Sequence, residues 1–264
     1  MSVAHDLLAG RVAELGLVRA SELPARGARA AASHTRPTPV PASRPASPEP
    51  EPEPPHDPEQ ALLPVSGALA GLLPWGGLRR GSTVSVHGST ALLLALVAQA
   101  SRAGSWCALV GLPGVGMAAA HEAGLDLACT ALVPRPGPRP ATVVAALVDG
   151  VDVVVLGGAS AWRAGDRQRL AARVRQKGAV LVPVGAWPGA DVELHATGGT
   201  WSGLLGDGAG RLRSRRVHLR CAARGRARDL GSDVLLPGPG GGCAPVRDDE
   251  AGPLGADLAP VRAG

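Results

Sequence analysis

The segment STVSVHGSTALLLALVAQA, residues 82–100, has the outline of a phosphate-binding unit. An apolar run ends at Gly88, the hydroxyl residues Ser89 and Thr90 follow, and a helical pattern begins at once. A phosphate loop has the form GxxxxGK[ST], because backbone N–H groups wrap the phosphates while a lysine reaches the terminal ones. Here the loop is about four residues too short, and Lys177, the only lysine, lies much later. We interpret Gly88, Ser89 and Thr90 as the remnant of a phosphate loop, with Ser89 or Thr90 as an N-cap.

A second position where chemistry is expected is the end of the apolar run VDVVVLGG, residues 151–158. In phosphoryl-transfer enzymes of this build, such a strand ends in an aspartate that holds magnesium. Gly157 and Gly158 stand at this end instead, and Asp152 lies at the opposite end of the run. The pattern therefore predicts no magnesium site here.

A dinucleotide site is the third possibility, because Gly114, Gly116 and Ala119 match GxGxxA. The first glycine follows its strand by several residues, and no acidic residue stands about twenty residues later to hold a ribose. A glycine-rich loop between a strand and a helix is the alternative interpretation. The histidines of the folded region show no ligand or catalytic spacing; they are His87, His121, His195 and His218. The sequence therefore predicts no catalytic residue, no metal ligand and no cofactor.

Arginine is concentrated in residues 211–228, RLRSRRVHLRCAARGRAR, with no acidic residue between. Alternation along a strand would place Val217, Leu219 and Cys221 on one face and Arg216, His218 and Arg220 on the other. A cationic strand face can contact phosphates, whereas a charged edge strand that resists aggregation is the alternative. The candidates for binding a partner protein or DNA are Arg211, Arg213, Arg215, Arg216, Arg220, Arg224 and Arg226.

These residues require a scaffold, and short apolar runs alternating with helical segments provide one. The predicted strands are 82–88, 105–111, 128–134, 151–157 and 179–185, and the predicted helices are 89–103, 115–124, 140–149 and 163–177. Apolar strands alternating with helices predict a mostly parallel sheet covered on both faces. After residue 185 the pattern is strand-like without helices, which predicts a C-terminal antiparallel pair with a loop near GDGAG.

The flanks differ in composition from this α/β core, which we place at residues 60–226. Residues 1–20 have apolar positions at helical spacing and predict a short amphipathic helix, which either docks onto the core or enters a groove of a partner. Residues 21–59 are proline-rich and predict a disordered linker. Residues 227–264 are rich in glycine and proline and predict a disordered tail.

Composition limits the class of protein more weakly. The net charge of +5 permits an acidic partner without proving one, and aromatic residues make up only 2% of the chain, so alanine, valine and leucine must fill the core. The four cysteines lack metal-ligand spacing, and Cys107 and Cys129 look like small buried apolar residues. No apolar run approaches the length of a membrane span, and no N-terminal signal pattern is present, so we expect a cytoplasmic protein without membrane contact.

Several of these segments together resemble the core of the bacterial recombinase RecA. The stretch LLPWGGLRRGSTVSVHG contains Gly76–Gly81, which matches the GGLxxG turn that leads into the first core strand of that family. The departures fall at catalytic positions: the phosphate loop is reduced to Gly88–Thr90, GLPG (residues 111–114) replaces the acidic residue after the second strand, and Gly157 replaces the magnesium aspartate. Three such losses suggest a RecA-like protein without ATPase activity.

A short, arginine-rich, RecA-like chain of this kind is similar to the actinobacterial ImuA-type accessory proteins of the damage-inducible mutasome. The resemblance implies a non-catalytic scaffold of translesion synthesis in the SOS response, associated with the nucleoid during repair. Its implied partner is an ImuB-type, polymerase-like adaptor, with DNA and self-association left open. A RecA-like inhibitor of cell division and an atypical nucleotide-binding enzyme are the alternatives.

Overall fold

The computed structural model describes residues 18–19, 62–204, 210–226 and 229–246. A sheet runs through the molecule in the order β6-β5-β7-β8-β4-β9-β10-β11-β12, in which parallel bridges Thr83–Leu181 and Val86–Val184 connect β8 to β4. Neighbouring strands from β6 to β9 are parallel, and β10, β11 and β12 each pair antiparallel with the strand before them. The strands of this sheet are β4 Val84–His87, β5 Cys107–Val110, β6 Thr130–Val133, β7 Val153–Leu156, β8 Val180–Pro183, β9 Val192–Leu204, β10 Gly210–Ala223, β11 Leu230–Leu235 and β12 Ala244–Pro245.

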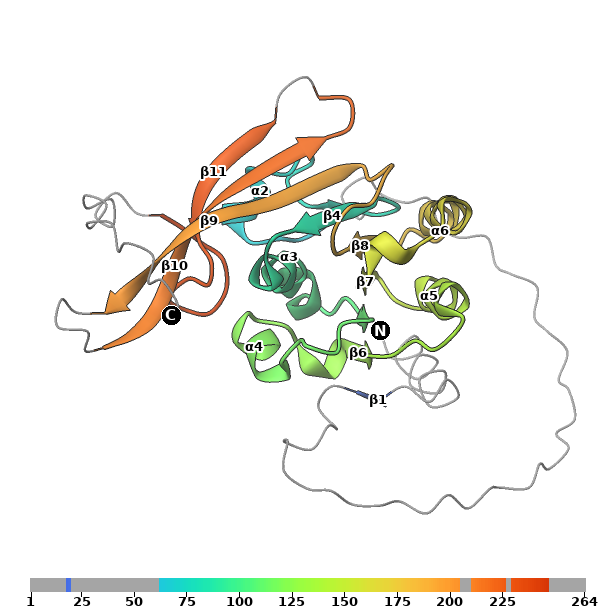
Figure 1. Ribbon diagram of the computed structural model, residues 1–264, viewed down its shortest axis with the longest axis horizontal. Helices are drawn as coiled ribbons and strands as arrows, with labels where there is room; N and C mark the ends of the chain where they lie inside the picture. Colours follow the sequence, from blue (N-terminus) through green and yellow to red (C-terminus); the bar gives the residue numbers. More distant parts are fainter. Residues whose placement is uncertain (1–17, 20–61, 205–209, 227–228, 247–264) are drawn as a thin grey trace, which may run out of the picture.

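Helices cover both faces of the parallel part of the sheet (Figure 1). On one face, α3 packs on alternate residues of the strands in a core that extends from α2 to β11. On the other face, α5 and α6 pack on the remaining residues of β5 to β8. Shorter helical elements lie between these. Within the described residues the helical elements are α2 Gly67–Ala70, α3 Thr90–Arg102, α4 Met117–Glu122, η3 Leu127–Cys129, α5 Pro140–Val148, η4 Ala159–Ala161 and α6 Ala164–Lys177.

The predicted fold class, an α/β sheet that is mostly parallel, flanked by helices and closed by an antiparallel segment, is confirmed. Each predicted core strand and helix is present within a few residues of its expected bounds. The strands are short and almost wholly buried, because helices exclude water from both faces. Cys107 is fully buried as expected, and burial raises the pKa of its thiol to about 12, whereas Cys129 is partly exposed.

The predicted disordered tail is wrong where the structure describes it. Residues 230–235 form β11 against β10, and β12 pairs with β11. Val234, Leu235 and Leu236 are buried in or beside the core. The glycine- and proline-rich average of the tail conceals this short apolar run, which gains its stability from the neighbouring strand rather than from local propensity.

The N-terminal prediction is also corrected where it can be compared. Val18–Arg19, the end of the segment predicted as a helix, form β1, which pairs antiparallel with β6. The edge strand β6 offers unpaired backbone groups, and these favour an extended partner. The rest of the predicted helix, the proline-rich linker and the GDGAG loop lie outside the described residues. A two-stranded sheet of β2 Leu62–Leu63 and β3 Leu78–Arg79 precedes β4.

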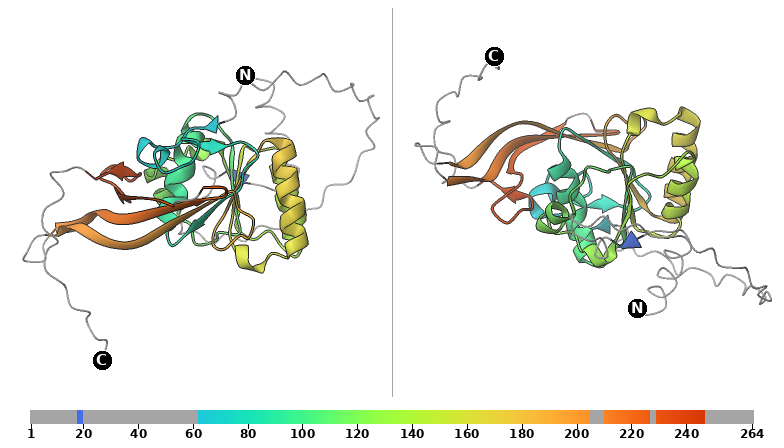
Figure 2. Two further views of the ribbon diagram at one scale, coloured as in Figure 1. Left: turned by 90° about the horizontal axis from the view of Figure 1, so that it is seen from above. Right: turned by 60° about the horizontal axis from the view of Figure 1, so that its bottom comes forward.

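The antiparallel segment extends well beyond the body of the protein. β9 and β10 form a long hairpin whose far end projects away from the helices, as both Figure 1 and the left view of Figure 2 show. We call residues 200–204 of β9 and 210–214 of β10 the arm. Nearly every side chain in the arm is exposed, Ser214 being the buried exception.

Candidate functional site

The turn after β4 packs closely against the neighbouring strand β9. Only Gly88 and Ser89 separate β4 from α3. Gly88 has a φ of +81°, and a Cβ atom there would lie 2.4 Å from the backbone oxygen of Ala196 in β9. The predicted N-cap is confirmed at Ser89, whose hydroxyl accepts a hydrogen bond from Leu92 N at 3.2 Å. The turn is therefore tight and packed on β9, with no loop to wrap a phosphate.

The ends of β5 and β7 are equally close to each other. Gly157 N donates to Val110 O at 2.8 Å, and a Cβ atom on Gly157 would lie only 2.2 Å from Gly111 O. A carboxylate side chain at position 157 would require the two strand ends to separate. Only glycine, which lacks a Cβ atom, fits this packing, and this explains why position 157 does not carry an acidic residue.

Asp152 lies at the opposite edge of the sheet, as its position in the run predicts. Its carboxylate accepts hydrogen bonds from Arg80 Nη2 at 2.8 Å and from Trp106 N at 2.9 Å. Arg80 belongs to the GGLxxG turn, so this ion pair connects the turn before β4 with the start of β7. The geometry gives Asp152 a structural role.

The dinucleotide interpretation gains no support from the loop after β5. A Cβ atom at Gly114 or Gly116 would meet nothing within 4 Å, so neither position requires glycine for a close approach. The helix that follows, α4, has only six residues. This geometry fits the glycine-rich connecting loop.

The expected alternation along β10 is present, and acidic residues accompany the arginines on its charged face. Val217, Leu219 and Cys221 are buried, whereas Arg216, His218 and Arg220 point to the other side. Two aspartates at β11 offset these charges, since Asp233 binds both Arg216 and His218 at 2.8 Å and Asp229 binds Arg220. Hydrogen bonds from His218 and then from Arg216 lower the pKa of Asp233 below its usual range. Long-range strand pairing therefore brings acids to this face that the local sequence lacks.

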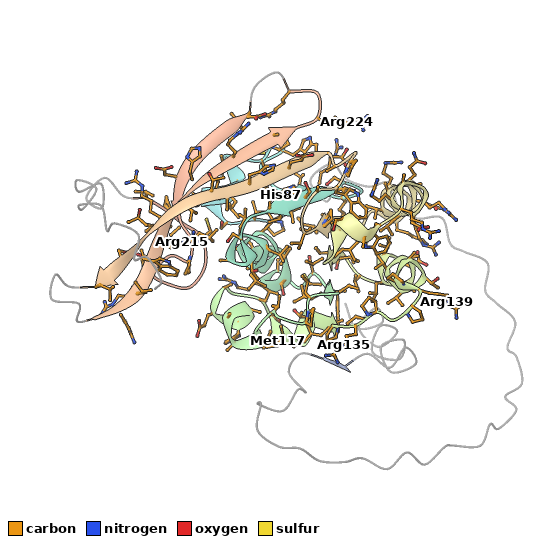
Figure 3. The ribbon with its side chains drawn as sticks, viewed as in Figure 1. His87, Met117, Arg135, Arg139, Arg215 and Arg224 are labelled. Carbon is orange, nitrogen blue, oxygen red and sulfur yellow. The ribbon has the colours of Figure 1, made fainter. Side chains whose placement is uncertain are left out.

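The other arginines are spread along the hairpin, and Figure 3 shows Arg215 and Arg224 far apart on it. Arg215 donates to Gly198 O at 2.6 Å and lies above Trp201, with its Cζ 6.0 Å from the ring centroid. Arg226 donates to Pro74 O at 3.0 Å, and Arg224 is exposed near the base of the hairpin. The seven candidates therefore do not form one site.

Arg211 and Arg213 lie in the arm, which also carries three exposed apolar side chains. Trp201, Leu204 and Leu212 are the large apolar side chains of the arm, with exposed fractions of 45%, 55% and 50%. Single exposed apolar residues are ordinary, but these three share one projecting hairpin with two arginines. Tryptophan and arginine are also the residues most enriched at the energetic centres of protein interfaces.

Strand pairing creates one further cluster, which the histidine spacing did not predict. His87 at the end of β4 lies beside His195 of β9, and Glu193 lies on the same face. The two imidazole rings stack with centroids 4.1 Å apart. The alternating pattern Glu193-x-His195 in a strand-like run is the one local signal that could have indicated it, because residues two apart share a face.

Comparisons with known proteins give partial matches that assign no function. A model of the family described as the MT3502 N-terminal domain matches residues 71–189. The uncharacterized protein Rv3395c of Mycobacterium tuberculosis is 43% identical over 130 residues, which are 47% of this chain and 63% of that protein. The match thus spans less than two thirds of the relative. The crystal structure of the RadB recombinase covers 68% of this chain and 97% of its own, with a TM-score of 0.49 and 17% identity.

Within the ranges that the structure describes, no helix combines the length and apolar character needed to cross a membrane.

Proposed function

We propose that this chain is a non-catalytic, RecA-like accessory protein of DNA-damage tolerance that binds an ImuB-type adaptor through the arm. The observation that carries the proposal is the contrast between the two ends of β9. At one end β9 packs on Gly88 and leaves no loop for a phosphate. At the other end β9 continues into a projecting hairpin that exposes Trp201 and Leu204.

Packing as well as missing side chains supports the proposed lack of ATP chemistry. Phosphoryl transfer needs positioned cations and carboxylates around the phosphates. The close approaches at Gly88 and Gly157 fill the places that those groups would need. ATP hydrolysis at this edge would therefore require a rearrangement of β9 and of the β5 and β7 ends.

The arm carries the residue types that are enriched at the centres of protein interfaces. A central apolar anchor with flanking arginines is typical of the energetic centre of an interface. Trp201 would act as the anchor, and Arg211 and Arg213 would pair with acidic groups of the adaptor. Because Arg216 and Arg220 already bind aspartates, their contribution to the contact is expected to be smaller.

Binding of the purified adaptor to variants of the full chain tests this proposal. We expect Trp201→Ala to weaken binding about 30-fold, which is the effect of removing an interface anchor, while the circular dichroism spectrum is unchanged. Arg211→Ala with Arg213→Ala should also weaken binding. The matched control removes two exposed arginines from the other side of the molecule, Arg135 and Arg139 (Figure 3), and should leave binding unchanged.

Three results would redirect the proposal. If the Arg135 and Arg139 substitutions weakened binding equally, the loss in the arm variants would reflect the overall charge of the protein and not a contact made by the arm. Loss of DNA binding in a gel-shift assay, with adaptor binding intact, would assign the arm to nucleic acid. Release of phosphate from ATP above the uncatalysed rate, lost in a variant of the turn after β4, would contradict the non-catalytic assignment.

A further inference from the structure

The cluster of His87, Glu193 and His195 is built by the register of two parallel strands. Ser85 of β4 pairs with Glu193 of β9, and His87 pairs with His195. Side chains two residues apart share a face of a strand, so all four lie on the side opposite α3. One ligand atom each from His87, Glu193 and His195 lies within 4.8 Å of the others.

The donor set is that of a transition-metal site. Two imidazoles with one carboxylate are ligands that zinc takes in proteins, with water in the remaining position. Imidazole also favours zinc, copper and nickel over magnesium or calcium, which prefer oxygen ligands. Glu193 Oε2 lies 3.5 Å from His195 Nε2, so one small ion could contact both after minor side-chain rotation.

A neighbouring hydroxyl and a nearby cation border the three side chains. The buried hydroxyl of Ser85 lies 3.2 Å from His87 Nε2 and holds that ring, as outer partners of metal ligands commonly do. Arg220, the residue of β10 opposite His195, is the adjacent cation. Its charge is offset by Asp229.

An ion can reach this place from solvent. The core beneath α5 and α6 draws on β5 to β8 and includes no residue of β4, β9 or β10 among those the structure describes. The side chains of His195 and Glu193 are 39% and 43% exposed. Both ligands on β9 can therefore rotate without disturbing buried packing.

We propose that His87, Glu193 and His195 bind one zinc-class divalent ion that joins β4 to β9. A metal lies in the plane of each imidazole that binds it, and the stacked rings are parallel to within 9°. Binding therefore turns at least one ring out of the stack. The ion would link the core strand β4 to the strand that extends into the arm, so its main effect is to stabilise this junction. This inference does not depend on the proposed adaptor.

Metal titration of the untagged full chain tests the site. Zinc at 100 times its dissociation constant should raise the Tm by about 5–11 °C. Cobalt should give visible d–d bands without the strong near-ultraviolet absorption of cobalt–thiolate bonds. His195→Ala and Glu193→Gln should each weaken binding by about 100-fold or more, since even partners of metal ligands contribute 10–100-fold.

Matched controls remove a histidine elsewhere, by His218→Ala on β10 and His121→Ala on α4, and should retain the affinity of the unmodified chain. An unchanged affinity in both His195→Ala and Glu193→Gln would overturn the site. Cobalt–thiolate absorption would overturn it as well, because the ion would then be bound by cysteine.

Discussion

Gly88→Ala tests whether β9 closes the turn after β4. Two separate effects of the added methyl group can be worked out from the structure. The φ of +81° is left-handed, which costs an L-residue about 1–2 kcal/mol. The new Cβ would also lie 2.4 Å from Ala196 O, a backbone atom that cannot rotate away. Overpacking of this kind costs about 1–3 kcal/mol.

The expected loss for Gly88→Ala is thus about 2–5 kcal/mol in the free energy of unfolding. For a domain of this size the Tm should fall by roughly 4–20 °C. Urea unfolding followed by circular dichroism measures the free energy, and thermal unfolding provides the Tm. The slope of the urea transition should stay constant, because the surface exposed on unfolding is unchanged.

Two other glycines separate the effects. Gly137 has a φ of +75° with nothing within 4 Å of its Cβ position, so Gly137→Ala should show the conformational part alone, about 1–2 kcal/mol. Gly114 has no left-handed φ and has open space at its Cβ position, so Gly114→Ala should be neutral or stabilising by up to about 1 kcal/mol. If Gly88→Ala costs no more than Gly137→Ala, β9 does not press on the turn, and packing does not exclude a phosphate from this edge.

Two further predictions concern the ion pairs. Asp233 should titrate below 3.8 in the folded chain, and His218→Ala should raise its pKa toward that value, as carboxyl NMR shifts would report. Since the folded pKa is depressed, the stabilisation from Asp233 is present above pH 3.8 and is lost as the pH falls through the folded value; an unchanged titration in His218→Ala would contradict the assigned cause. Asp152→Ala should destabilise the fold by about 1–3 kcal/mol in urea unfolding, because it leaves Arg80 and a backbone N–H without their acceptor. A loss below about 0.5 kcal/mol would show that water replaces the carboxylate.

The local pattern of the sequence was sufficient for the core. Apolar runs such as residues 151–157 and helical segments such as 163–177 predict their elements, because burial between helix layers selects these compositions. The Ser89 cap was predictable for the same reason, since capping acts over three residues. The remaining features depend on distant partners. The acids that pair with Arg216 and Arg220 are Asp233 of β11 and Asp229 immediately before that strand, which is concealed within a glycine- and proline-rich segment.

The register between β4 and β9 was likewise beyond local patterns. His87 and His195 are separated by more than a hundred residues, and only the parallel pairing of these strands makes them neighbours. The same pairing brings Ala196 over Gly88. One long-range register therefore decides both the closed turn and the histidine cluster, and neither could be derived from segment composition.

β9 connects the two proposals made for this protein. Its first half lies against β4, where it fills the turn at Gly88 and carries Glu193 and His195. Its second half leaves the sheet and becomes one side of the arm. A parallel sheet of this type ordinarily places its ligand site at the carboxyl ends of its strands. Here β9 covers part of that edge and extends into solvent, so the proposed function places the partner surface on the hairpin instead of at the edge of the sheet. A metal ion at the β4–β9 junction would act at the base of that hairpin, where fixing β9 would also fix the direction of the arm.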